Sequence, residues 1–187
     1  MNKRDLHMRN SRIYLTGFMG SGKSTIGPIL ANTIGYDFVD LDRMIEGMTG
    51  MSVTRLFREQ GEKIFRSLEH RAIVQVSATP RVVVSLGGGT VTEPATHDLI
   101  KSTGIVVYLS LSSDELMRRL QRRTDRPLLM NADGERLSEE ALRERVQSLR
   151  EQREPLYSQA DIVVPTDEKR LGITVDRIVK LLAPHLG

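Results

Sequence analysis

The sequence predicts an α/β fold, a three-layer sandwich in which a five-stranded parallel sheet lies between helices. Short apolar, β-branched runs such as Val82–Val84 and Ile105–Val107 alternate with longer stretches that carry apolar residues at helical spacing. This alternation is typical of a parallel sheet covered on both faces. The 187 residues show no linker, internal repeat or shift in composition, so we expect one domain.

In the first half of the chain, the expected strands are short apolar runs and the expected helices carry apolar residues three and four apart. Pro28 is tolerated early in the first helix, Ser52 is a helix cap, and Pro80 ends the last helical run. The expected elements are a strand at 12–17, a helix at 23–34, a strand at 36–41, a helical stretch at 44–48, helical runs before and after Gly61, and a strand at 82–86.

In the second half, serines mark the helix starts. Ser112 or Ser113 caps one helix, and Ser138 with two following glutamates opens another. Pro, Gly, Asn and Asp within residues 124–137 predict a mobile lid, and residues 1–10 predict a disordered tail before a domain at 11–187. The other expected elements are helices at 94–102, 113–120, from 138 and at 173–182, and strands at 105–109 and 162–164.

Composition excludes several classes of protein. Without cysteine the chain can form neither a disulfide nor a thiolate metal site, nor can it use a thiol nucleophile. No apolar run approaches the ~20 residues of a membrane span, and residues 1–12 lack the features of a secretory signal. A net charge of +3 is a small surplus, so we expect a cytoplasmic protein that binds neither membrane nor nucleic acid.

Residues 17–24 read Gly-Phe-Met-Gly-Ser-Gly-Lys-Ser, which fits the phosphate-binding pattern G-x-x-x-x-G-K-[ST]. Backbone N–H groups of such a loop surround phosphate oxygens at the start of a helix. Lys23 would reach the β- and γ-phosphates of ATP, and the Ser24 hydroxyl would bind Mg²⁺. The expected nucleotide-binding residues of this P-loop are Gly20, Ser21, Gly22, Lys23, Ser24 and Thr25.

Asp40 and Asp42 end the second expected strand, where residues two apart point to one side. Both carboxylates would face the P-loop, where one could hold a metal-bound water or accept a hydroxyl proton. The alternative is that Asp42 only caps the next helix. Ser85 follows the third strand where P-loop enzymes usually place an acid, which disfavours a GTPase or a motor protein and favours a small kinase.

Three further features indicate an anionic ligand. Arg66 is followed by Glu69 at a spacing that can fix a guanidinium, although an exposed pair would contribute little. The glycines of 87–89 directly follow a strand, which predicts either close approach of backbone to a ligand or simply a sharp turn. Arg126 lies in the expected lid, where it could stabilise transition-state charge as an arginine finger does.

Taken in order, the motifs resemble those of the shikimate kinase family, whose fold is similar to that of nucleoside monophosphate kinases. The matching segments are the P-loop, Asp40-Leu-Asp42, Phe65-Arg66-Ser-Leu-Glu69, Ser85-Leu-Gly-Gly-Gly89, Arg126-Pro-Leu-Leu129 and Arg153-Glu-Pro-Leu-Tyr157. The resemblance implies transfer of the ATP γ-phosphoryl group to the 3-hydroxyl of shikimate, a step toward chorismate and the aromatic amino acids.

The resemblance also implies roles for single residues. Asp42 would bind the ring hydroxyls and act as base, and Arg66 and Arg153 would clamp the shikimate carboxylate. The Gly88 N–H would donate to the substrate. The remaining implied roles are ring walls by Phe57 and Phe65 among helices at about 42–77, adenine packing by Arg119, phosphate contact by Arg126, and a Mg²⁺ contact through water by Asp40. We expect a monomer.

Three alternatives stay open from the sequence. A gluconate-type or nucleoside-monophosphate kinase shares the P-loop, lid and arginines, but Gly87–Gly89 and the paired aspartates count against it. A regulatory relative without turnover would be expected to lose substrate residues, which are intact here. Nucleic-acid binding would require a steep dependence of affinity on salt.

Overall fold

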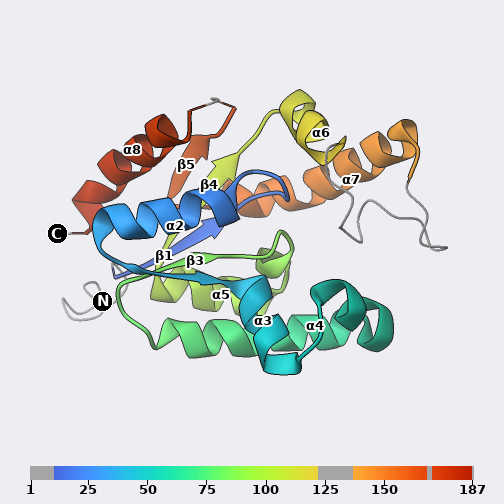
Figure 1. The fold of residues 1–187 in the computed structure, drawn as a ribbon, viewed down its shortest axis with the longest axis horizontal. Helices are drawn as coiled ribbons and strands as arrows, with labels where there is room; N and C mark the ends of the chain where they lie inside the picture. Colours follow the sequence, from blue (N-terminus) through green and yellow to red (C-terminus); the bar gives the residue numbers. More distant parts are fainter. Residues whose placement is uncertain (1–10, 122–136, 168–169, 187) are drawn as a thin grey trace.

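The computed structural model describes residues 11–121, 137–167 and 170–186 and confirms the predicted fold class (Figure 1). All pairings in the five-stranded sheet are parallel, in the order β2-β3-β1-β4-β5. The expected tail at 1–10, Arg126 and all of the expected lid except Leu137 lie outside the described residues. The strands are β1 (Arg12–Thr16), β2 (Asp37–Asp40), β3 (Val82–Ser85), β4 (Ile105–Ser110) and β5 (Ile162–Pro165).

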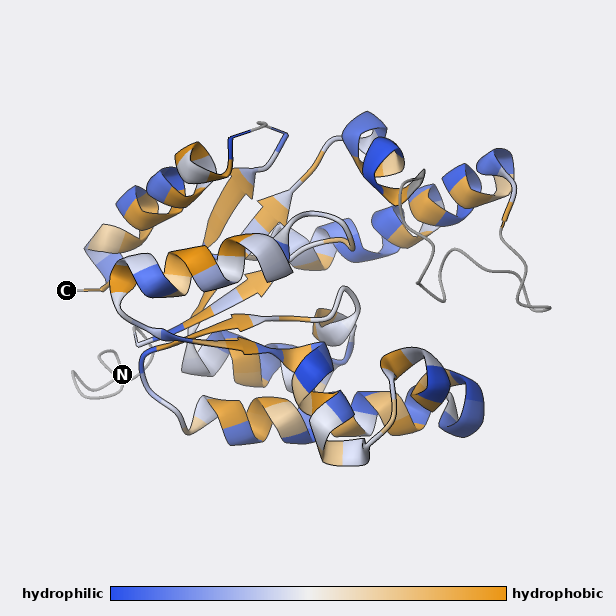
Figure 2. Ribbon diagram, in the orientation of Figure 1, coloured by the Kyte–Doolittle hydropathy of each residue, from blue (hydrophilic) through white to orange (hydrophobic). Residues whose placement is uncertain are grey.

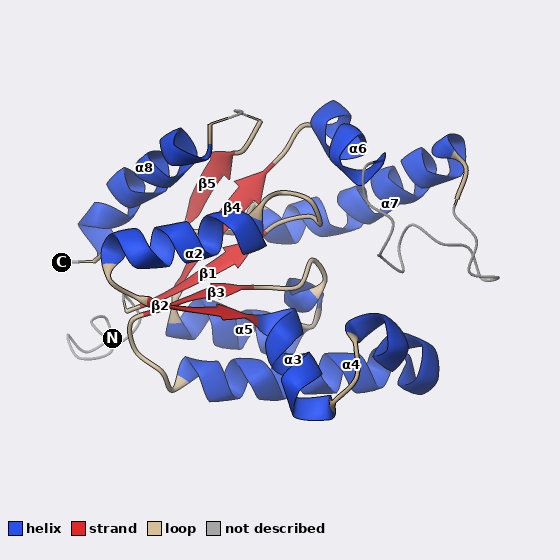
Figure 3. Cartoon of the chain, viewed as in Figure 1, coloured by secondary structure: helices blue, strands red, loops and turns tan. Residues whose placement is uncertain are grey.

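Helices cover both faces of the sheet (Figure 3). Two short 3-10 turns, η1 (Thr90–Thr92) and η3 (Ala183–His185), were not predicted. The α-helices are α2 (Lys23–Ile34), α3 (Leu41–Thr49), α4 (Val53–Ser77), α5 (Pro94–Thr103), α6 (Ser113–Gln121), α7 (Glu139–Tyr157) and α8 (Leu171–Leu182).

The central strands are buried on both faces because successive side chains point to opposite sides. In β3, Val82 and Val84 join the core formed with α3 to α7, whereas Val83 joins the core formed with α2 and α8. The strands accordingly appear as largely apolar bands between helices that carry polar residues on other faces (Figure 2). Burial on both sides explains why the strands are continuous apolar runs rather than alternating ones.

The second strand is shorter than predicted. Asp40 ends β2 and is the N-cap of α3, since its carboxylate accepts a hydrogen bond from the Arg43 N–H at 3.3 Å. Asp42 therefore lies in the first turn of a helix. The sequence prediction that Asp40 and Asp42 share one face of a strand is wrong. A side-chain cap ends the strand at this point because it satisfies a backbone N–H that the helix leaves unpaired.

The expected break at Gly61 is confirmed, since its φ of 80° and ψ of 170° interrupt the helical backbone within α4. Among the described residues, no helix is both long and apolar enough to cross a membrane.

Candidate active site

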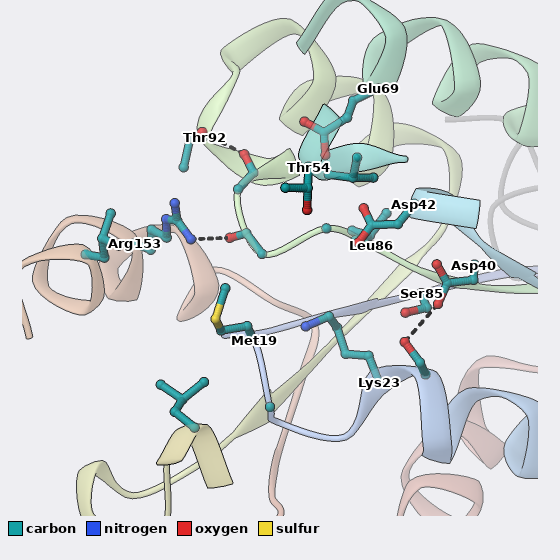
Figure 4. A pocket seen from close by; sticks show the side chains of 18 of the residues that line it. Met19, Lys23, Asp40, Asp42, Thr54, Glu69, Ser85, Leu86, Thr92 and Arg153 are labelled. Carbon is teal, nitrogen blue, oxygen red and sulfur yellow. Dashed lines mark hydrogen bonds between the residues drawn. The ribbon is translucent and has the colours of Figure 1, made fainter. Parts of the chain in front are cut away.

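A cleft of about 1600 Å³ opens beyond the carboxyl ends of the strands. Figure 4 shows Lys23, Asp40 and Asp42 near Ser85, with Arg153 across the cleft. Ligands of open parallel sheets bind at this edge. Ser21 is fully buried and does not line the cleft. The predicted site residues that do line it are Gly20, Gly22, Lys23, Ser24, Thr25, Asp40, Asp42, Phe57, Phe65, Arg66, Gly88, Arg119 and Arg153.

The P-loop is held in a conformation that requires glycine. Gly17, Gly20 and Gly22 have φ values of 137°, 83° and 102°, which side chains disfavour. Lys23 is buried, and its Nζ donates to the carbonyl oxygens of Gly17 at 2.7 Å and Phe18 at 3.1 Å. The loop thus encloses an ammonium group at the start of α2, where backbone dipoles also favour an anion.

The oxygen atoms suited to a metal ion lie beside this loop. The Ser24 hydroxyl donates to Asp40 Oδ2 at 2.8 Å, and Asp40 is paired in register with Ser85. Within the described ranges, no group of three or more His, Cys, Asp or Glu residues could hold a metal. This donor set fits Mg²⁺, which keeps several waters and binds through few protein oxygens together with substrate phosphates.

Arg66 lies in a partly buried ionic and aromatic cluster with the buried Glu69, so the alternative of an exposed Arg66–Glu69 pair is wrong. Its guanidinium pairs with Glu69 and, at 2.8 Å, with Glu62. The guanidinium carbon lies 6.0 Å from the centre of the Phe57 ring and 5.6 Å from that of Phe65, within the range of cation–π attraction. These contacts fix a planar cation that can bind a carboxylate with two parallel hydrogen bonds.

Glu69 is the buried partner of this cluster, with 1% of its surface exposed. It accepts hydrogen bonds from Arg66 and, at 2.5 Å, from the Thr90 hydroxyl. Burial raises the pKa of the Glu69 carboxyl, although Arg66 opposes the shift. Glu69 therefore links α4 to the turn that follows β3.

The glycines of 87–89 are explained by close contact with other side chains of the site, not by backbone conformation. None of the three has φ in the left-handed region. A Cβ on Gly87 would lie 2.7 Å from Glu69 Oε1, and a Cβ on Gly89 would lie 2.5 Å from Arg66 Nη2. Gly88 differs, because its carbonyl oxygen accepts hydrogen bonds from Arg153 Nη1 at 3.2 Å and from the Tyr157 hydroxyl.

Arg119, in α6, also lines the cleft and is held by hydrogen bonds to three other residues. Its guanidinium donates to Glu115 at 2.7 Å, to the Gly20 carbonyl at 3.1 Å and to the Thr166 carbonyl at 2.7 Å. Hydrogen bonds from Arg118 and Arg119 lower the pKa of Glu115 to about 2. The arginine therefore joins α6 to the P-loop and to the segment after β5.

Sequence reasoning missed the residues that hold the predicted ones in place: Glu62, Thr90, Glu115, Tyr157 and Thr166. Glu62 and Arg66, like Glu115 and Arg119, are four residues apart on a helix and form ion pairs. This spacing could have predicted both pairs from the sequence. The only sequence signal for Tyr157 was its position in the Arg153-Glu-Pro-Leu-Tyr157 segment. Thr90 and Thr166 make contacts between elements far apart in the chain, which no local pattern predicts.

The P-loop, the neighbouring aspartates and the arginines across one cleft define a kinase that phosphorylates a small molecule. The shikimate kinase family model matches residues 19–183. A curated shikimate kinase of Chlorobaculum parvum is 46% identical over 177 residues, covering 95% of each chain. The chain therefore belongs to the shikimate kinase family.

Solved structures agree with this assignment. A shikimate kinase from Bacteroides thetaiotaomicron has a TM-score of 0.85 and 34% identity, covering 92% of this chain and 98% of that one. One from Acinetobacter baumannii, in complex with shikimate, has a TM-score of 0.84 and 29% identity over 98% of each chain.

Proposed function

We propose that the cleft holds ATP against the P-loop and shikimate between α3, α4 and α7. Its activity is that of a shikimate kinase, which uses ATP to phosphorylate shikimate at the 3-hydroxyl. The observation that carries the division of roles is that Lys23, Asp42 and Arg66 line the same cleft. One cleft is thus lined by a cation for phosphate (Lys23), a carboxylate for a substrate hydroxyl (Asp42) and a guanidinium for a carboxylate (Arg66).

Shikimate is a small ring that carries a carboxylate and hydroxyl groups. In our proposal, Arg66 and Arg153 bind the carboxylate from opposite sides, because guanidinium forks match its geometry. The Gly88 N–H donates to the substrate, and Phe57 and Phe65 cover the apolar side of the ring. Their ring centroids are 4.4 Å apart, so the two rings form a continuous surface.

Asp42 is our candidate for the base that accepts the proton of the attacked hydroxyl. It is half-buried in the first turn of α3. The Cβ that Gly87 lacks would lie 3.4 Å from Asp42 Oδ1, so the carboxylate lies beside the turn that we assign to shikimate. A carboxylate held in such a place can both orient a hydroxyl and take its proton.

Lys23 neutralises charge on the transferred phosphoryl group, and Arg126 does so from the lid in our proposal. Gly20, Gly22 and Thr25 complete the phosphate site from the cleft lining, with Ser21 buried in the same loop, and Arg119 packs on adenine. Bound Mg²⁺ would supply neutralisation of charge on the ATP phosphates. Ser24 would hold this ion directly and Asp40 through water.

We further propose a cytoplasmic monomer whose ligands are small molecules and not nucleic acid or membrane. The small net charge of +3 supports small anionic ligands over nucleic acid. A gel-filtration mass near the 21.0 kDa of one chain, with no retention on DNA, is the expected result.

A coupled assay for ADP release tests the function. We expect release that depends on shikimate, with gluconate and AMP inactive, and no release by Lys23→Met. Preferential phosphorylation of gluconate or AMP would overturn the proposed substrate site, and full activity of Lys23→Met would overturn the role of the P-loop lysine.

A further inference from the structure

The last turn of α7 carries a tyrosine that is completely enclosed. Tyr157 is 0% exposed and does not line the cleft, yet its hydroxyl donates a hydrogen bond to the Gly88 carbonyl oxygen. Arg153, four residues earlier, donates to the same oxygen at 3.2 Å (Figure 4). Residues four apart share one face of a helix, so both side chains reach a single acceptor in the turn after β3.

The tyrosine is itself held by the sheet. Its ring stacks on that of Tyr108 in β4, with centroids 5.0 Å apart. The Tyr108 hydroxyl donates to both carboxylate oxygens of Glu154 at 3.1 and 2.9 Å, and Glu154 belongs to α7. These contacts fasten the end of α7 to β4 and leave the Tyr157 ring little freedom to turn.

The bond to Gly88 has one direction, because a carbonyl oxygen only accepts. Burial raises the pKa of Tyr157 to about 12, so the phenol keeps its proton at neutral pH and remains a donor. The Gly88 carbonyl and the Gly89 N–H belong to one planar trans peptide group. Holding the oxygen therefore fixes one side of Gly88, whose own N–H, in the preceding peptide group, is the donor that we assign to shikimate.

We propose that Tyr157 is a positioning residue for shikimate binding, which fixes the Gly88–Gly89 peptide and, through the shared carbonyl, the guanidinium of Arg153. It acts without touching the substrate. This inference rests on the proposed function, in which Gly88 and Arg153 bind shikimate. With the hydroxyl present, Arg153 is held beside Tyr157 with one N–H on the turn, and it lines the cleft in which a carboxylate would bind.

Tyr157→Phe tests the proposal because it removes the hydroxyl and keeps the buried, stacked ring. Tyr14→Phe is the matched control: Tyr14 is also fully buried, and its hydroxyl lies 3.0 Å from Thr103 Oγ1, away from the cleft lining. We expect Tyr157→Phe to raise the KM for shikimate about three- to tenfold, the range for loss of one hydrogen bond. The KM for ATP should not change, and Tyr14→Phe should leave both constants unchanged.

Thermal unfolding of both variants separates positioning from a general loss of structure. Similar melting temperatures for the two variants, with only Tyr157→Phe weakening shikimate, support the inference. An unchanged shikimate KM in Tyr157→Phe, or an equal rise in the KM for shikimate and ATP, overturns it.

Arg153→Lys separates this inference from the proposed function. If Arg153→Lys raises the shikimate KM and Tyr157→Phe does not, the positioning role fails while the carboxylate clamp stands. If Arg153→Lys leaves the shikimate KM unchanged, the clamp fails, and with it the part of the inference that runs through Arg153.

Discussion

The Ser24 hydroxyl donates a hydrogen bond to Asp40 Oδ2 at 2.8 Å. This contact joins the first residues of α2, which follow the P-loop, to the cap of α3 at the end of β2. The two residues are 16 positions apart in the chain, and the parallel sheet brings their strand ends to one edge. A hydroxyl and a carboxylate in contact here form the part of the cleft best suited to a hydrated cation.

We expect Asp40→Asn to raise the Mg²⁺ concentration that gives half-maximal activity about tenfold, the lower end of the range for lost outer-shell metal contacts. Asparagine is as good an N-cap as aspartate, so α3 should keep its start and the variant its stability. Titration of activity with Mg²⁺ at fixed ATP measures the effect. Asp37→Asn, the same change at the exposed opposite end of β2, is the control; equal Mg²⁺ curves for both variants would refute the role.

Asp42→Asn should lower kcat by about 100-fold or more, because general-base catalysis contributes ~10²–10⁴. Asparagine keeps the size of the side chain and can still bind a hydroxyl, so the KM for shikimate should change little. Steady-state kinetics at saturating ATP give both constants. If kcat stays within about threefold of the wild type, Asp42 orients shikimate but is not its base.

Gly89→Ala should weaken shikimate binding through Arg66. The backbone of Gly89, at φ −109° and ψ 0°, accommodates alanine, but the added Cβ would lie 2.5 Å from Arg66 Nη2. Overpacking of this kind typically costs ~1–3 kcal/mol, and we expect a rise of about tenfold in the KM for shikimate, with that for ATP unchanged.

The control for this change is Gly47→Ala in α3, where an added Cβ meets nothing within 4 Å. Alanine inside a helix should raise the free energy of unfolding by about 0.5–1 kcal/mol and leave the kinetics alone. The same KM for shikimate in the two variants would contradict the prediction, because it would show that Arg66 can be displaced without loss of binding.

The sequence predicted which segments carry the functional residues better than it predicted the local backbone geometry of those segments. The P-loop and the glycines of 87–89 could be found because each is a short pattern just after a strand, and Arg66 because Glu69 follows it at helical spacing. The start of α3 could not be placed, because the cap at Asp40 competes with continuation of the strand by a single side-chain hydrogen bond. The contacts of Thr90 and Tyr157 depend on packing between distant elements, which residue spacing does not encode.

Glu69→Gln should show how burial and ion pairing compete in the site. Burial lowers the pKa of Arg66, but its two carboxylate partners together outweigh burial and raise it. Glu69 has one guanidinium partner, and both its burial and the charge of Asp42 raise its pKa. A carboxyl with a native pKa above the ordinary value of about 4.3 is bound to a proton more often in the folded than in the unfolded state. Its contribution to stability must therefore fall as pH rises through that interval.

Glutamine does not titrate, so the difference in free energy of unfolding between wild type and Glu69→Gln isolates this contribution. We expect the wild type to lose stability relative to the variant as pH rises from about 4 through the raised pKa, then to keep a constant difference. Urea denaturation at a series of pH values measures it. A difference that instead grows in favour of the wild type with rising pH would mean that the Arg66 pair outweighs burial, with the Glu69 carboxylate stabilised in its ionised form.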